Sequence, residues 1–163
     1  MSINKNNVIG ENVCFSKTSQ IGNFNVIGDG VVLNENVVIG NFCEVGKDVI
    51  VHKNSILQGR IRTADNCIIE ENVTLKYGVI LTSDVLIKKG AFVGPNVITL
   101  GSTHERVTLH GTIIGQNTYV GANSTIAPNT KIGDNIVIGA NAYVNKDISE
   151  PGVYVGTPIR KIR

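Results

Sequence analysis

Residues 114–144, IGQNTYVGANSTIAPNTKIGDNIVIGANAYV, carry an aliphatic side chain at their first position and at every sixth position after it. The same spacing runs from Ile3 to Thr99, with only three departures from Ile, Leu and Val. A period of six matches neither the 3.6-residue face of a helix nor a flat sheet with long-range pairing. It is typical of a parallel β-helix, a solenoid in which each coil stacks on the previous one.

The other positions of the hexapeptide predict one short strand and one corner. The residue two places before the aliphatic one is small or β-branched, and it shares the inward face because side chains alternate along a strand. The residue three places before it is Asn, Asp or Gly in a series running from Asn12 to Asn141. These residue types tolerate positive φ, so we expect them at the corners of the coil.

The residue just before each aliphatic position should point outward. The repeat resembles that of known hexapeptide-repeat proteins, in which three hexapeptides make one coil, and this resemblance implies that residues 18 apart form columns. One such column is mixed, since it contains Glu44 and Arg62. Another is entirely apolar: Cys14, Val32, Ile50, Ile68 and Leu86. Single Val and Ile residues are common on protein surfaces, but a continuous apolar stripe needs a partner to cover it. The apolar column therefore predicts self-association.

Length and composition indicate one domain, residues 1–163, with a short tail over about 149–163. The chain has 15 Lys and Arg against 13 Asp and Glu, which gives no support for nucleic-acid binding. It contains no run of 18 apolar residues, and its first ten residues lack a signal-peptide core, so we expect no membrane span and a cytoplasmic protein. Cys43 and Cys67 occupy inward positions on different faces, where they should act as small hydrophobes in a reducing compartment.

The repeat is interrupted between Leu100 and Thr112, in the segment LGSTHERVTLHGT. Loops on rigid scaffolds often carry function, and His can act as a general base near neutral pH. His104 and His110 lie in this segment, and Glu105 could orient His104 or simply be solvated. His52 replaces the usual Gly of a regular coil, and we interpret it as a corner residue.

The segment GPNVITLGSTHE, residues 94–105, resembles the GPNV…TxxH stretch of hexapeptide-repeat sugar acetyltransferases such as galactoside and maltose O-acetyltransferases. This resemblance implies an all-β fold: a left-handed parallel β-helix of triangular 18-residue coils, interrupted by a loop near residues 100–112. It also implies that His104, with Glu105 beside it, removes a proton from the acceptor. In this family the protein is a homotrimer, and each site lies between neighbouring subunits.

Residues 112–163 are similar to the C-terminal half of the same family, and VGTPIRKIR matches its closing motif VGxPAxxIR, with Ile159 where Ala is usual. The resemblance implies acetyl-CoA as co-substrate, with no metal. Its pantetheine arm would lie along the C-terminal coils, and the basic end of the chain could meet its phosphates or be an ordinary solvated tail. The cofactor-binding residues implied in this way are Gly121, Ala122, Ala140, Thr157, Pro158, Arg160 and Lys161.

Other parts of the sequence bear on the acceptor. The early start of the coils and the segment ENVTLKYGVILTSDVLIKKGAFVGPN, residues 71–96, resemble N-acetyltransferases of amino sugars linked to UDP or dTDP. Those enzymes often carry an Asn where this chain has LGST. The resemblance thus implies a sugar or nucleotide-sugar acceptor, with a role in surface polysaccharide or lipopolysaccharide biosynthesis, and leaves O- and N-acetylation both open.

Two other functions remain possible. The segment LHGTIIG, residues 109–115, resembles the LHGxxIG stretch of γ-class carbonic anhydrases, which hold their metal with three His ligands. When His110 is matched to the last ligand, Glu105 and Glu70 or Ile69 stand in the other two places, so two ligands are missing. The second alternative is a non-catalytic β-helix that serves as a scaffold.

Overall fold

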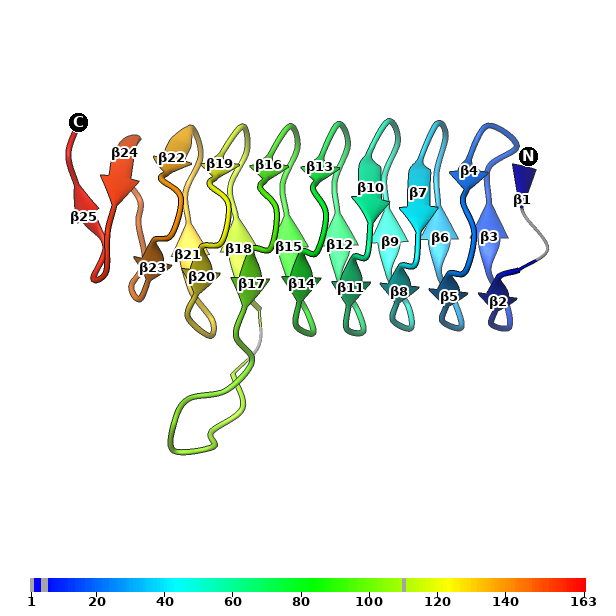
Figure 1. Cartoon of the computed structure of the whole chain (residues 1–163), viewed down its shortest axis with the longest axis horizontal. Helices are drawn as coiled ribbons and strands as arrows, with labels where there is room; N and C mark the ends of the chain where they lie inside the picture. The colour runs from blue at the N-terminus through cyan, green and yellow to red at the C-terminus, as the bar shows by residue number, and fades with distance from the viewer. Residues whose placement is uncertain (1, 4–5, 110) are drawn as a thin grey trace.

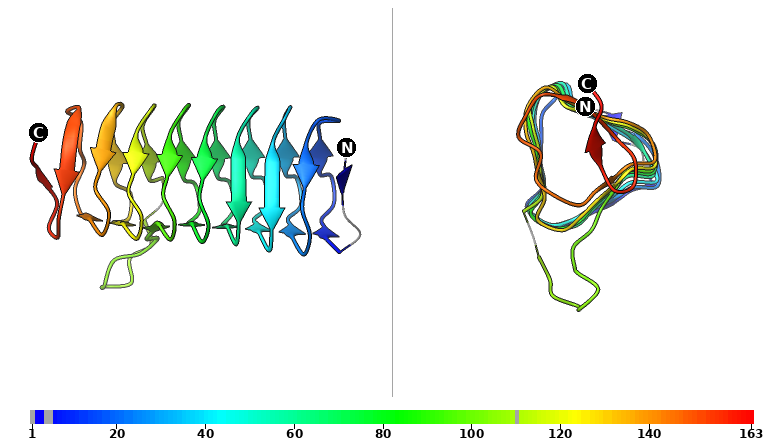
Figure 2. Two further views of the ribbon diagram at one scale, coloured as in Figure 1. Left: turned by 45° about the horizontal axis from the view of Figure 1, so that its top comes forward. Right: turned by 90° about the vertical axis from the view of Figure 1, so that its left-hand side faces the viewer.

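The structure is a computed structural model that describes residues 2–3, 6–109 and 111–163, and all regular elements among these residues are β-strands. The strands form three long sheets, A, B and C, which make the three sides of a triangular prism (Figures 1 and 2). In Figure 1 the chain descends on the near side, returns upward on the far side and advances from right to left, so the coil is left-handed. The predicted left-handed parallel β-helix is confirmed.

From β1 to β23, every third strand along the chain belongs to the same sheet, and β24 and β25 extend sheet A. In spatial order, sheet A contains β1 (Ser2–Ile3), β4 (Gln20–Ile21), β7 (Val38–Asn41), β10 (Ile56–Gly59), β13 (Thr74–Leu75), β16 (Phe92–Val93), β19 (Tyr119–Val120), β22 (Ile136–Ile138), β24 (Gly152–Val155) and β25 (Arg160–Lys161). Sheet B contains β2 (Val8–Ile9), β5 (Val26–Ile27), β8 (Glu44–Val45), β11 (Arg62–Thr63), β14 (Ile80–Leu81), β17 (Ile98–Thr99), β20 (Thr125–Ile126) and β23 (Tyr143–Val144). Sheet C contains β3 (Cys14–Phe15), β6 (Val32–Leu33), β9 (Ile50–Val51), β12 (Ile68–Ile69), β15 (Leu86–Ile87), β18 (Ile113–Ile114) and β21 (Lys131–Ile132).

The register of the sheets confirms the coil of 18 residues. Residues 18 apart are paired in parallel throughout the regular coils, as Ile50, Ile68 and Leu86 are in sheet C. The predicted apolar column therefore exists, and in the structure it continues to Ile113 and ends at Lys131. Its members lie on the outer surface of sheet C, where Ile68 is 38% exposed.

The inward side chains form one continuous core along the axis of the prism. Fully buried side chains such as Leu57 and Ile69 each contribute roughly 1.5–3 kcal/mol to stability. Thr63 and Thr99, which interrupt the aliphatic series, are buried as well, so the register continues through them. The Thr99 hydroxyl accepts a hydrogen bond from the Thr82 N–H at 2.8 Å, which offsets the cost of burying it.

The cysteines lie where the repeat predicts. Cys43 and Cys67 are buried, on the coil segments that lead into β8 and β12, and Cys14 is exposed on sheet C. Burial raises the pKa of the Cys67 thiol to about 11, and its Sγ lies 3.1 Å from the Thr82 carbonyl oxygen, to which it donates. These two side chains therefore act as small core residues.

The corners are named here by the sheets they join, A/B, B/C and C/A. The Asn, Asp and Gly residues predicted there all have positive φ, for example 55° at Asn96 and 56° at Asn141. Asn tolerates this conformation because its short polar side chain can bond locally. Three exceptions follow one another on the A/B corner: Phe24, Phe42 and Arg60, with φ of 59°, 59° and 50°. The asparagine pattern does not predict them.

Residues 149–163, expected to form a short tail, complete the C-terminal end of the prism. Strand β24 pairs in parallel with β22, and β25 folds back antiparallel on β24. Tyr154 and Ile159 are buried against the core, and the Tyr154 hydroxyl donates to the Glu150 carbonyl oxygen at 2.8 Å. This segment therefore covers core side chains that would otherwise face water.

Candidate active site

The interruption of the repeat lies at the B/C corner, between β17 and β18. Residues paired between β17 and β20, such as Ile98 and Thr125, are 27 positions apart instead of 18. The inserted residues form a hairpin that projects beyond the triangular cross-section (Figures 1 and 2). The predicted break at residues 100–112 is thus confirmed in position.

Backbone hydrogen bonds give the hairpin a defined shape. The Leu109 N–H donates to Gly101 O at 2.9 Å, and the Thr103 N–H donates to Val107 O at 2.9 Å. At the tip, the Arg106 N–H donates to Thr103 O at 3.0 Å, and Arg106 has φ of 63°. His104 and Glu105 are the two central residues of this tight turn.

The turn presents His104 to solvent. Its side chain is 92% exposed, and its Nε2 atom lies 4.0 Å from the Glu105 carboxylate, too far for a hydrogen bond. In the single chain, therefore, Glu105 does not hold the imidazole in one orientation. His110, the other histidine of the segment, lies outside the described residues.

Most of the predicted cofactor residues share one place in the fold. Gly121, Ala122, Ala140 and Thr157 lie on the A/B corner of three successive coils, and the Asn141 N–H donates to Ala122 O at 2.9 Å. A Cβ on Gly121 would overlap the backbone of Gly139 and Ala140, so only glycine fits there. Gly121 is buried between coils, Ala122 is half-buried and Ala140 is exposed.

The closing motif forms a hollow at the C-terminal end of this corner. A pocket of about 320 Å³ is lined by Gly156, Thr157, Pro158, Ile159 and Arg160. Arg160 is exposed at its rim, whereas the Lys161 ammonium pairs with Glu150 at 3.2 Å and lies 5.8 Å from the centre of the Tyr154 ring. Arg160 is therefore the freer of the two predicted cations to meet a phosphate.

The single chain does not bring these two groups of residues together. The hairpin leaves the prism at the B/C corner, and the cofactor candidates lie on the A/B corner, at the other end of the sheet B strands. The end-on view shows the hairpin directed away from the body of the prism (Figure 2). Within one chain, therefore, His104 does not lie beside the A/B corner at Gly121, Ala122, Ala140 and Thr157, which we call the cofactor edge.

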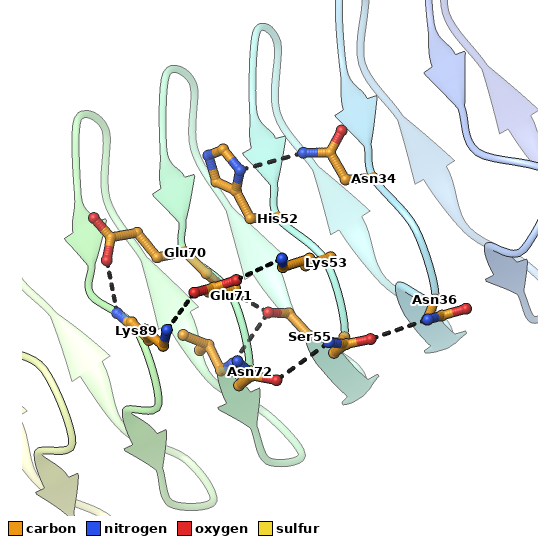
Figure 3. Close-up of polar contacts among 11 residues, drawn as sticks. Asn34, Asn36, His52, Lys53, Ser55, Glu70, Glu71, Asn72 and Lys89 are labelled. Carbon is orange, nitrogen blue, oxygen red and sulfur yellow. Dashed lines mark hydrogen bonds and ion pairs between the residues drawn. The ribbon is translucent and has the colours of Figure 1, made fainter.

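The C/A corner holds a polar groove that the sequence did not predict. Of its residues, only His52 was interpreted from the sequence, as a corner residue. It has a volume of about 520 Å³ and is lined by Asn34, Glu35, His52, Lys53, Glu70, Glu71 and Lys89. All of these except Glu35 are labelled in Figure 3. The Asn34 amide nitrogen lies 3.2 Å from His52 Nδ1, and the Glu70 carboxylate accepts from the Lys89 N–H at 2.7 Å. The signal in the sequence is the run of Asn34, His52, Glu70 and Lys88 at places where other coils have Gly.

Glu71 and the two lysines of this groove form an ion-pair cluster. Glu71 lies between the ammonium groups of Lys89 and Lys53, the latter at 3.2 Å (Figure 3). Hydrogen bonds from these two ammonium groups lower the pKa of Glu71 from its usual 4.5, and the bond to Glu71 raises the pKa of Lys89 from 10.5. Within the described residues, no three His, Cys, Asp or Glu side chains lie close enough to hold a metal ion.

We expect Glu71→Gln to reduce the acid sensitivity of the fold. Because the pKa of Glu71 is lowered in the folded state, its contribution is present above pH 4.5 and is lost as the pH falls through the lowered pKa. The melting temperature of the variant should therefore fall less than that of the wild type between pH 6 and pH 3. Glu35→Gln is the control, because it removes a carboxylate of the same groove that forms no ion pair among the described residues. Equal slopes for all three proteins would contradict this role of Glu71.

Comparisons with known proteins agree with the fold. Residues 111–146 match a family model described as "Bacterial transferase hexapeptide (six repeats)". A comparison with curated proteins gives no significant match. None of the described residues forms a helix with the length and hydropathy that a membrane crossing requires.

Several solved structures share this fold at low sequence identity. The acetyltransferase domain of PglB from Neisseria gonorrhoeae, in complex with acetyl coenzyme A, has a TM-score of 0.54 and 16% identity over 93% of this chain. The UDP-N-acetylglucosamine acyltransferase of Francisella novicida has a TM-score of 0.61 and 16% identity over 99% of this chain. That of Campylobacter jejuni has a TM-score of 0.52 and 17% identity over 98%.

This chain spans 55% of the PglB domain and 70% and 71% of the two acyltransferases. The resemblance to a hexapeptide-repeat, left-handed β-helix family is therefore confirmed for the repeat and for the fold. The chain is a left-handed β-helix, and the repeat of its C-terminal coils matches the bacterial transferase hexapeptide model.

Proposed function

We propose that this protein is an acetyltransferase that transfers the acetyl group of acetyl-CoA to a sugar or a nucleotide-linked amino sugar. The observation that carries the proposal is His104, displayed on a hydrogen-bonded hairpin directly before the coils that match the transferase hexapeptide model. The three neighbours named above are acyl- or acetyltransferases, and one of them holds acetyl coenzyme A. These comparisons support the class of reaction.

The described residues fit acetyl-CoA as co-substrate. The small residues Gly121, Ala122 and Ala140 line the A/B corner, along which a pantetheine arm can lie. The pocket of the closing motif, with exposed Arg160 at its rim, suits the phosphates, because a guanidinium forms bidentate hydrogen bonds with phosphate oxygens. Thr157 and Pro158 form the wall of this pocket.

The reaction needs a base for the acceptor. The His104 imidazole takes the proton of the acceptor hydroxyl or amine while the acceptor atom bonds to the thioester carbonyl carbon. A backbone N–H stabilises the negative charge that develops on the carbonyl oxygen. The C–S bond then breaks, and the imidazolium returns the proton to the departing CoA sulfur. The acetylated sugar and free CoA thiol are the products.

The separation of His104 from the A/B corner in one chain supports an assembled site. We propose a homotrimer in which the exposed hairpin of one copy reaches the cofactor edge of its neighbour, with the apolar column of sheet C at the contact. An exposed imidazole in water is a poor catalyst unless a neighbouring surface positions the substrate beside it.

We further propose that the protein works in the cytoplasm, in the supply of acetylated sugars for surface polysaccharide such as lipopolysaccharide. Its three free cysteines, two of them buried in the core, suit a reducing compartment. Two of the neighbours are named as acyltransferases of UDP-N-acetylglucosamine, a nucleotide-linked sugar, which supports this class of acceptor.

CoA binding tests the cofactor assignment. Isothermal titration calorimetry with CoA should show binding, and Arg160→Ala should weaken it by about tenfold, the usual effect of losing one charge-assisted hydrogen bond. Lys161→Ala should cost less, because Lys161 is already paired with Glu150. Lys17→Ala, which removes an exposed cation at the far end of the prism, is the control and should bind as the wild type does. The proposal fails if CoA does not bind at millimolar concentration.

A further inference from the structure

Four side chains form an exposed ridge on the A/B corner of the N-terminal coils, and we call Phe24, Phe42, Arg60 and Tyr77 the corner ridge. The two phenyl rings are stacked, with centroids 5.2 Å apart and an angle of 11° between their planes. Phe24 and Phe42 are each 55% exposed, and Tyr77 is 57% exposed. Tyr77 lies against Gly59, where a Cβ would come within 2.7 Å of its ring.

The corner ridge is unfavourable for the isolated chain in two ways. Phe24, Phe42 and Arg60 hold the left-handed backbone conformation, which costs free energy for such residues, while later coils place Asn96, Asn123 and Asn141 at the equivalent positions. The exposed rings also leave apolar surface in water. Asparagine would avoid both costs, so the ridge is best explained by something that binds to it.

The chemistry of the ridge matches a nucleotide. Exposed aromatic rings provide stacking surface for a base, and a guanidinium binds phosphate oxygens in pairs. Arg60 is exposed, and among the described residues no ion pair involves it. Its charge is therefore available to a diphosphate.

The corner ridge and the cofactor edge lie on the same corner of the prism. Phe24, Phe42 and Arg60 lie on the same corner as Ala122 and Ala140, on earlier coils of the prism. Neighbouring coils are about 4.8 Å apart, so Arg60 lies three coils, about 14 Å, from the level of Ala122. In a nucleotide-linked sugar the sugar is bonded directly to the diphosphate, so a diphosphate at Arg60 places the sugar roughly one to two coils further along the corner, toward Ala122.

We propose that the corner ridge binds the nucleoside diphosphate part of a nucleotide-linked sugar acceptor. Arg60 contacts the diphosphate, Tyr77 lies beside it, and the base stacks at Phe42 and Phe24. This proposal rests on the proposed acetyl transfer, because it places the acceptor along the same edge as CoA. It selects a nucleotide-linked sugar over a free sugar as the acceptor class.

Binding of UDP, dTDP and GDP to the full chain tests the proposal by calorimetry. At least one of the three should bind to the wild type, Arg60→Asn should weaken that binding by about tenfold or more, and Phe42→Asn by about fivefold. Both variants introduce the residue that other coils use at this corner, so their melting temperatures should equal or exceed that of the wild type. Lys17→Asn removes the same charge elsewhere and should leave nucleotide binding unchanged.

The possible outcomes separate this proposal from the proposed function. If CoA binds and none of the three nucleotides binds at millimolar concentration, the ridge proposal is overturned while the acetyltransferase proposal stands. If a nucleotide binds through Arg60 and CoA does not bind, the ridge proposal is supported and acetyl transfer is rejected. If Arg60→Asn and Phe42→Asn change the mass of the assembly in light scattering but not the nucleotide affinity, the ridge is a contact between copies and the proposal is wrong.

Discussion

His104→Ala should lower the rate of acetyl transfer by roughly a hundredfold or more, the usual cost of removing a general base. The side chain is 92% exposed at the tip of a hairpin and contributes nothing to the stacked core. The melting temperature and the mass of the assembly should therefore stay at their wild-type values. The assay is release of CoA thiol from acetyl-CoA, with a panel of sugar nucleotides as acceptors.

His110→Ala is the matched control in the same segment and should have the smaller effect. If His104→Ala keeps full activity on the true acceptor, the base is assigned wrongly, and the acceptor is an amine that binds already deprotonated and needs only positioning. If His110→Ala lowers the rate of acetyl transfer more than His104→Ala does, His104 is not the base. A β-helix that serves only as a scaffold would show no turnover with any acceptor, and the loss of His104 would then have no measurable effect.

Ile68→Glu should dissociate the assembly into single chains. Ile68 is in the middle of the apolar column of sheet C, between Ile50 and Leu86, and is 38% exposed in the single chain. A carboxylate buried without a partner in an apolar contact costs roughly several kcal/mol. Multi-angle light scattering at micromolar concentration should give the mass of a trimer for the wild type and of a monomer for the variant.

The same coil offers a close control on another face. Ile56 is also an outward isoleucine with 38% exposure, but it belongs to sheet A, where the column contains the polar Gln20 and Thr74. Ile56→Glu should therefore leave the assembly intact. A wild-type monomer, or equal dissociation by both substitutions, would show that the sheet C column is not the contact.

Much of the fold could be predicted because the repeat is a local signal. Each coil contacts only its neighbours, so a single inward position every six residues specifies both the core and the register. That register holds even at Thr63 and Thr99, where the residue type departs from the pattern. It also places the break at Leu100, since no aliphatic residue continues the series through the hairpin.

The corner positions show where residue type misled the interpretation. The prediction of positive φ rested on Asn, Asp and Gly, which prefer this conformation for local reasons. Phe24, Phe42 and Arg60 adopt it as well, because the stacked coils above and below hold the chain in the same path. Tertiary context overrides local preference at these positions, and this is how the corner ridge arises.

The sequence by itself determined the hexapeptide register, the inward and outward faces, the placement of the cysteines and the position of the break, because all of these follow from periodicity along the chain. Only the tertiary structure decided which distant residues share an edge. Stacking places Phe42, Arg60, Ala122 and Ala140 on one corner, sends the His104 hairpin out from another, and folds β25 back over the C-terminal end of the core. The physical reason is that the conformation of a strand and its corner depends on residues close together in the sequence. An edge of the prism, in contrast, forms only when the coils stack in register.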